Sequence, residues 1–343
     1  MGKLALLWNL LMDFIFLTLH VLCSLILIIK SRAHAILDMG PYLSSFSAVL
    51  VSILSRKPLI AWKRGDPIKN AILHSLSEKS VLSNLFLQFF IILEVISAQK
   101  ADLVICDNSK TIHTFEKYAS DRIVSLPTSV DLERFEYNAN ERQIQRKQLG
   151  FNTNDFVLLY AGRLEIGKGI RPLIEAVHIS KDQIPHIQLA IAGSGTLEQE
   201  LRSLVLNYGV QDRVRFLGSV PYDGMPRLIH ASDCVVLLST AEGTPRILLE
   251  ALACGKPIIA SNVGGIAEMF AKNQTIGEQV MVTTPQNIIS AFQKIIIKEQ
   301  DSTRKPQNAI LRCNLIAKHY SLQIIGKKFV RYIQAVISSS LPR

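Results

Sequence analysis

Beyond residue 150, the chain alternates short apolar runs with segments whose apolar residues recur at helical spacing. The runs are rich in β-branched residues, and glycine or small residues follow each of them. Strands that alternate with helices form βαβ units, so the pattern predicts an α/β fold with a parallel sheet covered by helices on both faces. The predicted strands are Phe156–Ala161, Ile187–Ala192, Val214–Leu217, Cys234–Leu238 and Pro257–Ala260.

Glycine-rich or polar loops directly follow all five predicted strands. They begin at Gly162, Gly193, Gly218, Ser239 and Ser261. The carboxyl ends of parallel strands share one edge of a sheet, and ligands of open α/β sheets bind at that edge. The pattern therefore predicts a ligand site in this half of the chain without naming the ligand.

The first 135 residues are less regular, but they predict a second α/β domain. An apolar stretch at Val81–Ile96 indicates a helix of this domain. The strand-like runs are Ala35–Leu37, Pro58–Trp62, Leu103–Cys106 and Ile123–Leu126.

Polar segments and turn residues suggest the domain boundaries. Pro127–Asp131 and the polar stretch Asn138–Gln148 are typical of an interdomain connection, and Asn308–Ile337 is amphipathic at helical spacing. We predict an amino-terminal, acceptor-side domain over 1–135, a second domain over 150–310 and a carboxyl-terminal helix over 311–343 that packs back.

The amino-terminal segment 4–29 is apolar and long enough to cross a bilayer as a helix. Its polar interruptions share one helical stripe, and a lipid-exposed span would bury an aspartate near the middle of the bilayer. Three interpretations stay open: a helix of the domain core, a helix in the lipid interface, and a span. The interruptions are Asn9, Asp13, His20 and Ser24.

Charge and cysteine content narrow the classes of partner. The chain has 38 basic and 28 acidic residues, a net charge of +10, and is 48% apolar. This surplus favours a phosphorylated substrate or a membrane surface; nucleic acid is not expected, because no Lys/Arg-rich run of five occurs. Five cysteines without C-x-x-C spacing predict neither disulfides nor structural zinc, which favours a reducing, cytosol-facing location.

The segment Gly162–Gly169 leaves a predicted strand and enters a helix. It carries Arg163 and Lys168 on a glycine-bearing turn. Two cations ahead of a helix N-terminus can converge on an anion, and an arginine fork suits phosphate oxygens. An ordinary surface turn with two exposed cations is the alternative.

A second segment places two glutamates around a predicted helix over about 245–254. Thr244 is the predicted N-cap and Pro245 the predicted first helical residue. Glu250 lies two turns along this helix, and Glu242 lies just before it. Arg246 and Glu250 are spaced for an i,i+4 ion pair, but that reading leaves Glu242 unexplained.

In this order and spacing, four motifs resemble those of the retaining glycosyltransferases of the two-Rossmann GT-B fold, family four (glycosyl transferases group 1). The likeness is strong over 150–290 and moderate over 100–135. The motifs are Gly162-Arg163-Leu164-x-x-x-Lys168-Gly169, Ala192–Gly195, the Glu-x7-Glu pair of Glu242 and Glu250, and Val263–Glu268.

The resemblance implies a nucleotide-diphosphate sugar donor held mainly by the second domain, with no metal or other cofactor. Arg163 and Lys168 would offset the charge developing on the leaving diphosphate, and Glu242 would lie beside the donor sugar. Glu250 would accept the ribose hydroxyls. The implied donor-binding residues are Gly162, Gly193, Gly218, Gly243, Thr244, Pro245 and Glu250.

The first domain departs from the family pattern in two places. Family members open with a strand, a glycine-rich loop and further βα units, whereas this chain has 33 mostly apolar residues before His34, so we expect a first domain shortened at its amino end. Where relatives commonly carry a histidine, this chain reads Lys63-Arg64-Gly65-Asp66. Arg64 cannot act as a base at neutral pH, but Arg64 and Asp66 could contact the acceptor.

The leading hypothesis is a retaining hexosyltransferase that uses a lipid-linked or surface-glycan acceptor. It would work at the cytoplasmic face of a membrane, as a peripheral or amino-terminally anchored protein. The alternatives are a non-catalytic sugar-nucleotide-binding subunit, half of a split glycosyltransferase completed by a partner subunit, and a sugar-nucleotide epimerase of similar architecture.

Overall fold

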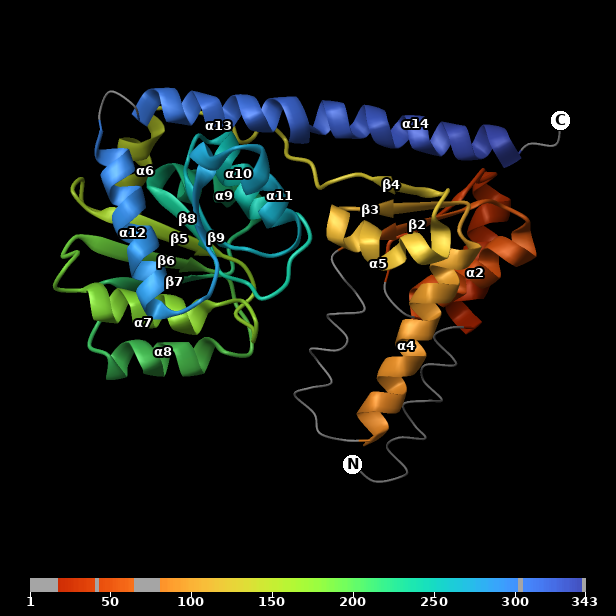
Figure 1. The fold of residues 1–343 in the computed structure, drawn as a ribbon, viewed down its shortest axis with the longest axis horizontal. Helices are drawn as coiled ribbons and strands as arrows, with labels where there is room; N and C mark the ends of the chain where they lie inside the picture. Colours follow the sequence, from red (N-terminus) through yellow and green to blue (C-terminus); the bar gives the residue numbers. More distant parts are fainter. Residues whose placement is uncertain (1–17, 41–42, 65–80, 302–304, 341–343) are drawn as a thin grey trace. The chain divides into compact units, whose positions relative to one another are not determined.

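The computed structural model describes residues 18–40, 43–64, 81–301 and 305–340, which form two α/β units (Figure 1). The first unit comprises Met1–Pro127 and Gly326–Arg343, and the second comprises Thr128–Ile325. Among the described residues, each unit contains one sheet, and every strand pair in the two sheets is parallel. The predicted α/β class with two parallel sheets is therefore confirmed.

The sheet of the first unit has the order β1-β2-β3-β4. A helix over residues 18–31 precedes it, and part of the last helix, α14, joins this unit through Phe329, whose ring centroid lies 5.2 Å from that of Trp62. The elements are β1 (Ile36–Asp38), α2 (Leu43–Ser55), β2 (Leu59–Lys63), α4 (Val81–Lys100), β3 (Leu103–Cys106), α5 (Ser109–Ala119), β4 (Ile123–Ser125) and α14 (Leu322–Ser340).

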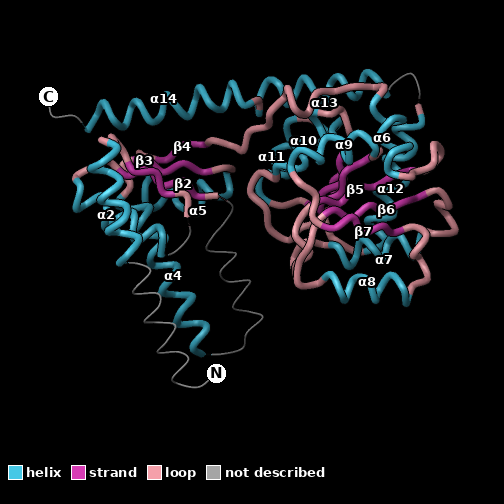
Figure 2. The backbone as a smooth tube through the Cα atoms, turned by 180° about the vertical axis from the view of Figure 1, so that it is seen from behind, coloured by secondary structure: helices cyan, strands magenta, loops and turns pink. Residues whose placement is uncertain are grey.

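The second unit carries the larger sheet, in the order β10-β9-β8-β5-β6-β7. Figures 1 and 2 show α7 and α8 on one face of this sheet and α9 and α10 on the other. The elements are α6 (Glu141–Leu149), β5 (Phe156–Ala161), α7 (Ile170–Ser180), β6 (Ile187–Ala192), α8 (Glu198–Asn207), β7 (Val214–Gly218), η1 (Tyr222–Gly224), α9 (Met225–Ala231), β8 (Cys234–Leu237), α10 (Arg246–Ala253), β9 (Ile258–Ser261), α11 (Gly264–Lys272), η2 (Gln274–Ile276), β10 (Gly277–Val280), α12 (Pro285–Gln300) and α13 (Lys305–Tyr320).

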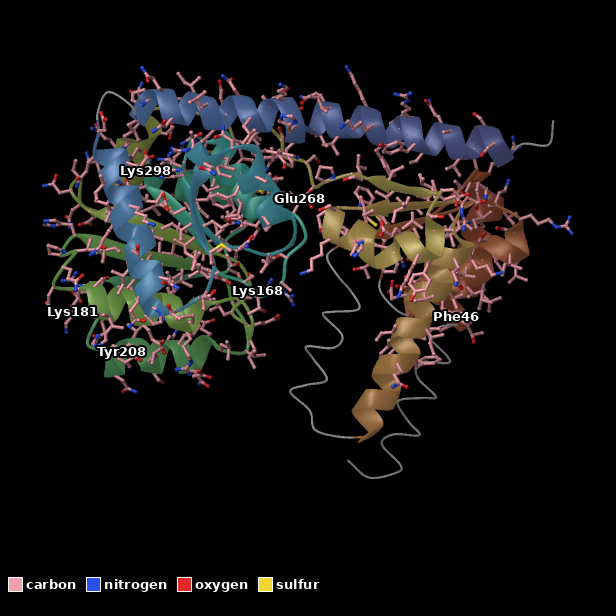
Figure 3. All side chains as sticks on the ribbon, viewed as in Figure 1. Phe46, Lys168, Lys181, Tyr208, Glu268 and Lys298 are labelled. Atoms are coloured by element: carbon pink, nitrogen blue, oxygen red, sulfur yellow. The ribbon has the colours of Figure 1, made fainter. Side chains whose placement is uncertain are left out.

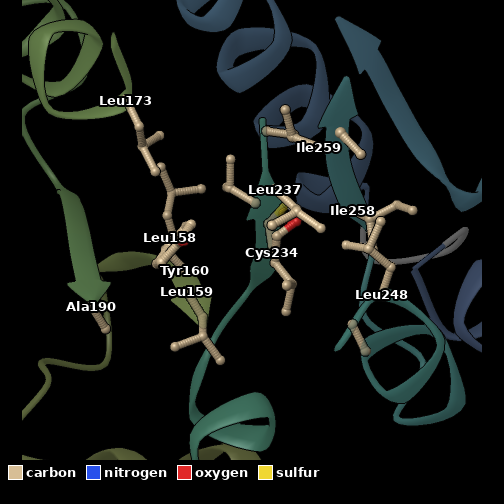
Figure 4. Packing of buried hydrophobic residues seen from close by; sticks show 14 of the residues in the cluster. Leu158, Leu159, Tyr160, Leu173, Ala190, Cys234, Leu237, Leu248, Ile258 and Ile259 are labelled. Carbon is tan, nitrogen blue, oxygen red and sulfur yellow. The ribbon is translucent and has the colours of Figure 1, made fainter. Parts of the chain in front are cut away.

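The strand order of the second unit reverses direction between β5 and β8. The chain builds outward from β5 through β6 to β7, then returns to the other side of β5 and continues through β8 and β9 to β10. Strands β5, β8 and β9 are almost wholly buried, as their apolar sequences require. Figure 4 shows side chains of these three strands packed together. This reversal defines the point at which open α/β sheets bind ligands.

The polar stripe predicted for the amino-terminal helix can be followed only in part. Asn9 and Asp13 lie outside the described residues, and the helix continues to residue 31 instead of ending at 29. The Nδ1 atom of His20 lies 2.7 Å from the Ser47 hydroxyl of α2, so the stripe faces protein at this position. Of the helices in the described ranges, none is both long and apolar enough to cross a membrane.

The prediction that Asn138–Gln148 is an interdomain connection is wrong. These residues lead into and form most of α6, which belongs to the second unit and packs on α9. Arg146 anchors this helix: its buried guanidinium pairs with Asp233 and donates to the carbonyl of Ala231 over 2.9 Å. The helix was not predicted from this polar sequence because the partners of its buried arginine, Asp233 and Ala231, lie far away in the chain.

Two further predictions need correction. The carboxyl-terminal helix is interrupted at Ser321 between α13 and α14, where the N–H of Leu322 donates to the carbonyl of Val130 and the N–H of Val130 donates to the carbonyl of Tyr320. Strand β10 was not predicted, because only one of its four residues is a large apolar one. It is an edge strand, with a neighbour on one side only.

Candidate functional site

The loops that follow β5 and β8 meet where the strand order of the second sheet reverses. Lys168, labelled in Figure 3, lies in the first loop, and Glu242 lies in the second. The Lys168 Nζ atom is 2.7 Å from Glu242 Oε1, and the N–H of Thr240 donates to the carbonyl of Gly167 over 2.8 Å. Two of the three predicted catalytic side chains are therefore in contact.

Arg163, the third predicted catalytic residue, has a different partner. Its guanidinium lies 2.9 Å from Glu165 Oε1, and 72% of its side chain is exposed. Lys168 is more enclosed, with 23% of its side chain exposed. The two predicted cations therefore contact separate carboxylates, and the exposed pair of Arg163 contributes little to stability.

The predicted donor-binding glycines Gly162, Gly193 and Gly218 lie side by side at the ends of β5, β6 and β7. The N–H of Gly162 donates to the carbonyl of Ala192 over 3.0 Å, and the N–H of Gly193 donates to the carbonyl of Gly218 over 2.7 Å. A Cβ on Gly193, where φ is +142°, would lie 1.9 Å from the carbonyl oxygen of Gly162. The close approach of the two backbones therefore excludes a side chain at Gly193, and the three glycines present peptide groups at this edge of the sheet.

Gly243 and its neighbours lie against the amino end of α11. The N–H of Gly265 donates to the carbonyl of Gly243 over 2.8 Å. A Cβ on Gly264, where φ is +48°, would lie 1.8 Å from the carbonyl oxygen of Glu242. Glycines at these two positions therefore allow α11 to hold the loop that carries Glu242.

The N-cap of α10 differs from the prediction. Pro245 occupies the N-cap position and makes no side-chain cap, and the helix begins at Arg246. Thr244, the predicted cap, is buried, and a Cβ on Gly265 would lie 2.8 Å from its hydroxyl oxygen. Thr244 therefore packs against the amino end of α11.

Gly169 offers a stability test of this site. Its φ is +70°, and a Cβ there would lie 2.2 Å from the carbonyl oxygen of Leu238. Gly169→Ala is expected to destabilise the protein by at least ~2 kcal/mol, because the left-handed conformation alone costs about 1–2 kcal/mol and the loop must also shift. Chemical denaturation gives the free energy of unfolding.

The matched control for Gly169→Ala is Gly209→Ala. Gly209 has a similar φ of +61°, but a Cβ there would meet nothing within 4 Å. This variant should show the conformational cost only, about 1 kcal/mol. Equal losses in the two variants would contradict a close approach of the two loops.

Glu250 on α10 is buried and only partly satisfied. It is 3% exposed, and within the described chain its Oε1 atom has no hydrogen-bond partner. Burial raises its pKa to about 7, while Arg246 and a hydrogen bond from the Tyr222 hydroxyl oppose that rise. Arg246 and Glu250 do not form the i,i+4 ion pair; Arg246 lies over the Tyr222 ring, 6.0 Å from its centroid.

Ser239, two residues after β8, carries a second buried oxygen atom, its hydroxyl oxygen, without a hydrogen-bond partner among the described residues. An unpaired buried polar atom is costly, so each such atom calls for an explanation. A polar ligand at this edge of the sheet could supply the missing hydrogen bonds. The sequence placed Ser239 in a polar loop but gave no signal that its hydroxyl would be unpaired.

The carboxyl edge of the first sheet carries a buried ionic cluster that sequence reasoning missed. Lys63 ends β2, and its Nζ atom lies 2.7 Å from Glu94 Oε2 and 3.7 Å from Asp38 Oδ2. The predicted acceptor-side residue Arg64 follows directly and is exposed, whereas Asp66 lies outside the described residues. The lysine is therefore enclosed within the first unit, whereas the arginine next to it is open to solvent.

Metal ligands do not gather in the described part of the chain. No group of three or more His, Cys, Asp or Glu side chains in these ranges could hold a metal ion. This absence does not test the expectation that Arg163 and Lys168 take the place of a metal ion, which stays a prediction.

Comparison with known proteins decides the family. The family model of glycosyl transferases group 1 matches residues 141–312, which is half of the chain. The chain belongs to the glycosyl transferases group 1 family. The match lies within the second unit, and it contains both loops of the Lys168–Glu242 contact.

Two relatives illustrate the extent of the sequence similarity. An uncharacterised glycosyltransferase of Methanocaldococcus jannaschii is 30% identical over 217 residues, 55% of each chain. The UDP-Gal:alpha-D-GlcNAc-diphosphoundecaprenol alpha-1,3-galactosyltransferase of Escherichia coli is 31% identical over 209 residues, 59% of this chain and 53% of that enzyme. This member of the group 1 family therefore aligns with about half the length of these relatives.

Solved structures show the fold. HepE of Anabaena, crystallised in complex with UDP, superposes with a TM-score of 0.69 at 23% identity, covering 85% of this chain and 76% of that one. Sucrose-phosphate synthase of Thermosynechococcus elongatus gives a TM-score of 0.71 at 21% identity, covering 86% and 72%. The fold of this group 1 glycosyltransferase is GT-B, as the sequence motifs predicted.

Proposed function

We propose that this protein transfers a hexose from a nucleotide-diphosphate sugar to a lipid-linked or surface-glycan acceptor, with retention of anomeric configuration. The observation that carries this proposal is the Lys168–Glu242 contact at the reversal point of the sheet that the family model matches. The galactosyltransferase relative, whose name specifies a diphosphoundecaprenol-linked acceptor, supports a lipid-linked acceptor here.

The proposed donor site uses Lys168 as the cation for the leaving diphosphate. A lysine ammonium has three N–H donors, and the contact with Glu242 uses one of them, so two can serve phosphate oxygens. Lys168 would stabilise the negative charge that grows on the diphosphate as the bond to the sugar breaks. Because Lys168 supplies this charge, the proposal includes no metal ion.

The remaining residues of the proposed site bind and orient the donor. The exposed guanidinium of Arg163 exchanges Glu165 for the diphosphate, Glu242 lies beside the sugar, and the peptide groups of Gly243–Pro245 contact sugar and phosphate. The unpaired Oε1 of Glu250 accepts a ribose hydroxyl, which removes the cost of leaving it unsatisfied. The membrane part of the proposal places the first unit at the cytoplasmic face of a membrane.

A thermal-unfolding screen of UDP-, GDP- and ADP-sugars in excess EDTA tests the proposed function. A sugar nucleotide with the matching base should stabilise the protein by about 2.7 kcal/mol at a concentration of 100 times its Kd. Sugar transfer by the same protein, also in EDTA, is the second readout. If no sugar nucleotide stabilises it, the proposed donor site is wrong; if Mg²⁺ is needed for the effect, the metal-free part is wrong.

A further inference from the structure

A pocket of about 510 Å³ lies in the first unit, away from the residues discussed so far. It opens between the end of the helix over 18–31 and the end of α2. Its lining combines aliphatic side chains with three basic ones and one hydroxyl. The main lining residues are Leu25, Ile28, Ile29, Leu54, Ser55, Arg32, His34 and Lys57.

The position of the pocket separates it from the proposed acceptor side. His34 lies two residues before β1, and Lys57 lies two residues before β2. The pocket is therefore at the amino ends of these parallel strands, whereas Lys63 and Arg64 mark the carboxyl end of β2. Catalytic ligands of open α/β sheets bind at the carboxyl edge, so this pocket serves a different purpose.

The basic side chains around the pocket lack compensating carboxylates. Residues 18–57 contain four Lys or Arg residues and a single acid, Asp38, which is buried beside Lys63. Within the part of the chain that the structure describes, none of the four takes part in an ion pair. Unpaired cations around one pocket attract an anion. The four are Lys30, Arg32, Arg56 and Lys57.

The backbone conformation at two of these four basic residues is unusual, which is an observation independent of their charge. Among the described residues, Arg32 and Arg56 are the two non-glycine residues with positive φ, at 53° and 54°. Arg32 lines the pocket, and Arg56 lies between two lining residues. A left-handed conformation favours glycine or asparagine, so the arginines are placed there at a conformational cost.

Exposed aliphatic side chains lie around the basic residues of the pocket. Ile29 is 77% exposed and Leu54 is 63% exposed, and both line the pocket. On the helix over 18–31, His20 contacts Ser47 of α2, while the exposed apolar residues recur mainly at helical spacing on another side. These exposed residues are Leu19, Leu22, Ile26, Leu27 and Ile29, joined by Ile53 and Leu54 of α2.

We propose that this pocket binds the phosphate headgroup of an anionic phospholipid in a bilayer. Arg32, His34 and Lys57 contact the phosphate, while the exposed aliphatic residues enter the interfacial region and the helix over 18–31 lies along the surface. A free phosphate ion would leave the aliphatic side chains uncovered, and an apolar protein partner would leave the charges of Arg32 and Lys57 unpaired. The inference extends the membrane part of the proposed function but assigns this pocket no role in transfer.

The test is cosedimentation of the full chain with vesicles of phosphatidylcholine, alone or mixed with phosphatidylglycerol. Binding should be stronger to the anionic vesicles. The double variant Arg32→Gln/Lys57→Gln should bind them about 25-fold more weakly, because each basic residue near an anionic surface contributes roughly fivefold. Glutamine keeps the positive-φ position occupied by a non-glycine residue.

The matched control is Lys147→Gln/Lys318→Gln, which removes two exposed lysines of the second unit. It should change binding less than twofold, and unfolding curves for both variants establish that they are folded. Equal binding to the two kinds of vesicle, or equal weakening in the two double variants, would overturn the proposal. Release from vesicles by inorganic phosphate at matched ionic strength would also overturn it, since free phosphate would then be the ligand.

A label on Cys23 locates the contact. Cys23 is exposed on the helix over 18–31, whereas Cys106, Cys234 and Cys254 are buried. An environment-sensitive fluorophore at Cys23, with Cys313→Ser to remove the remaining accessible thiol, should shift to the blue on anionic vesicles. An unchanged spectrum while the protein cosediments would place the contact elsewhere and overturn the proposal. Because this readout needs no donor sugar, it can succeed or fail independently of the transfer assay.

Discussion

Lys168→Ala is expected to lower kcat/KM for sugar transfer by about 10²–10³-fold, the usual loss for a donor that stabilises developing negative charge. Lys168 is partly enclosed and lies 2.7 Å from Glu242 at the reversal point of the sheet. A cation held in this position acts more strongly on a growing charge than one that is free in solvent. Steady-state kinetics with the donor found in the thermal screen measure the effect.

Arg171→Ala is the control for Lys168→Ala. Arg171 lies on α7, three residues further along the chain, and pairs with Glu200 at the surface, where both side chains are about half exposed. Its removal should change kcat/KM less than twofold. Similar losses in the two variants would contradict the assignment of Lys168 to the leaving diphosphate. A double-mutant cycle of Lys168→Ala with Glu242→Gln should be non-additive, since the two side chains touch.

Glu250→Gln is expected to stabilise the donor-free protein by about 3 kcal/mol at a pH well above 7. Below pH 4.5, the carboxyl is protonated in both the folded and the unfolded chain, so it adds no pH-dependent cost. As pH rises from 4.5 towards 7, the unfolded chain loses its proton first and stability falls; above 7 the full cost remains. Unfolding free energies of wild type and variant should therefore converge at low pH.

Glu250→Gln should also weaken the binding of the donor. Replacing the acceptor carboxylate of the proposed ribose contact should raise the donor KM about tenfold or more, with kcat nearly unchanged, because the contact is the same in the ground and transition states. Glu242→Gln should mainly lower kcat. The stability control is Glu136→Gln, which makes the same substitution at an exposed position of the chain. Identical kinetic profiles for Glu242→Gln and Glu250→Gln would contradict their separate roles.

The sequence predicts the strands of the second unit best where burial dictates composition. Strands β5 and β6 begin and end at the predicted residues, because strands that are buried on both faces consist mostly of apolar residues. Strand β10 escapes prediction because an edge strand tolerates polar residues. Helix α6 escapes prediction because Arg146 is satisfied by Asp233, 87 residues away in the chain, and no local pattern shows such a partner.

In the candidate site, too, the sequence indicates single residues but not the contacts between distant parts of the chain. Lys168 and Glu242 are each suggested by their motifs, but their contact depends on β8 returning to lie beside β5, which a single sequence does not reveal. The buried cluster of Lys63, Glu94 and Asp38 likewise forms only when three separate elements pack. Motifs name the residues, while the strand order determines which of them meet.

The first unit is discontinuous in sequence, and this limits how the protein can be dissected. A single cut between Pro127 and Thr128 would leave Phe329 of the later fragment still covering Trp62 of the earlier one. The two fragments would have to remain associated for the first unit to keep its packing. Conversely, a fragment that stops at Pro127 would expose the ring of Trp62. Expression of the first unit by itself therefore calls for a circular permutation or a fused linker that joins its two segments, not for a simple truncation.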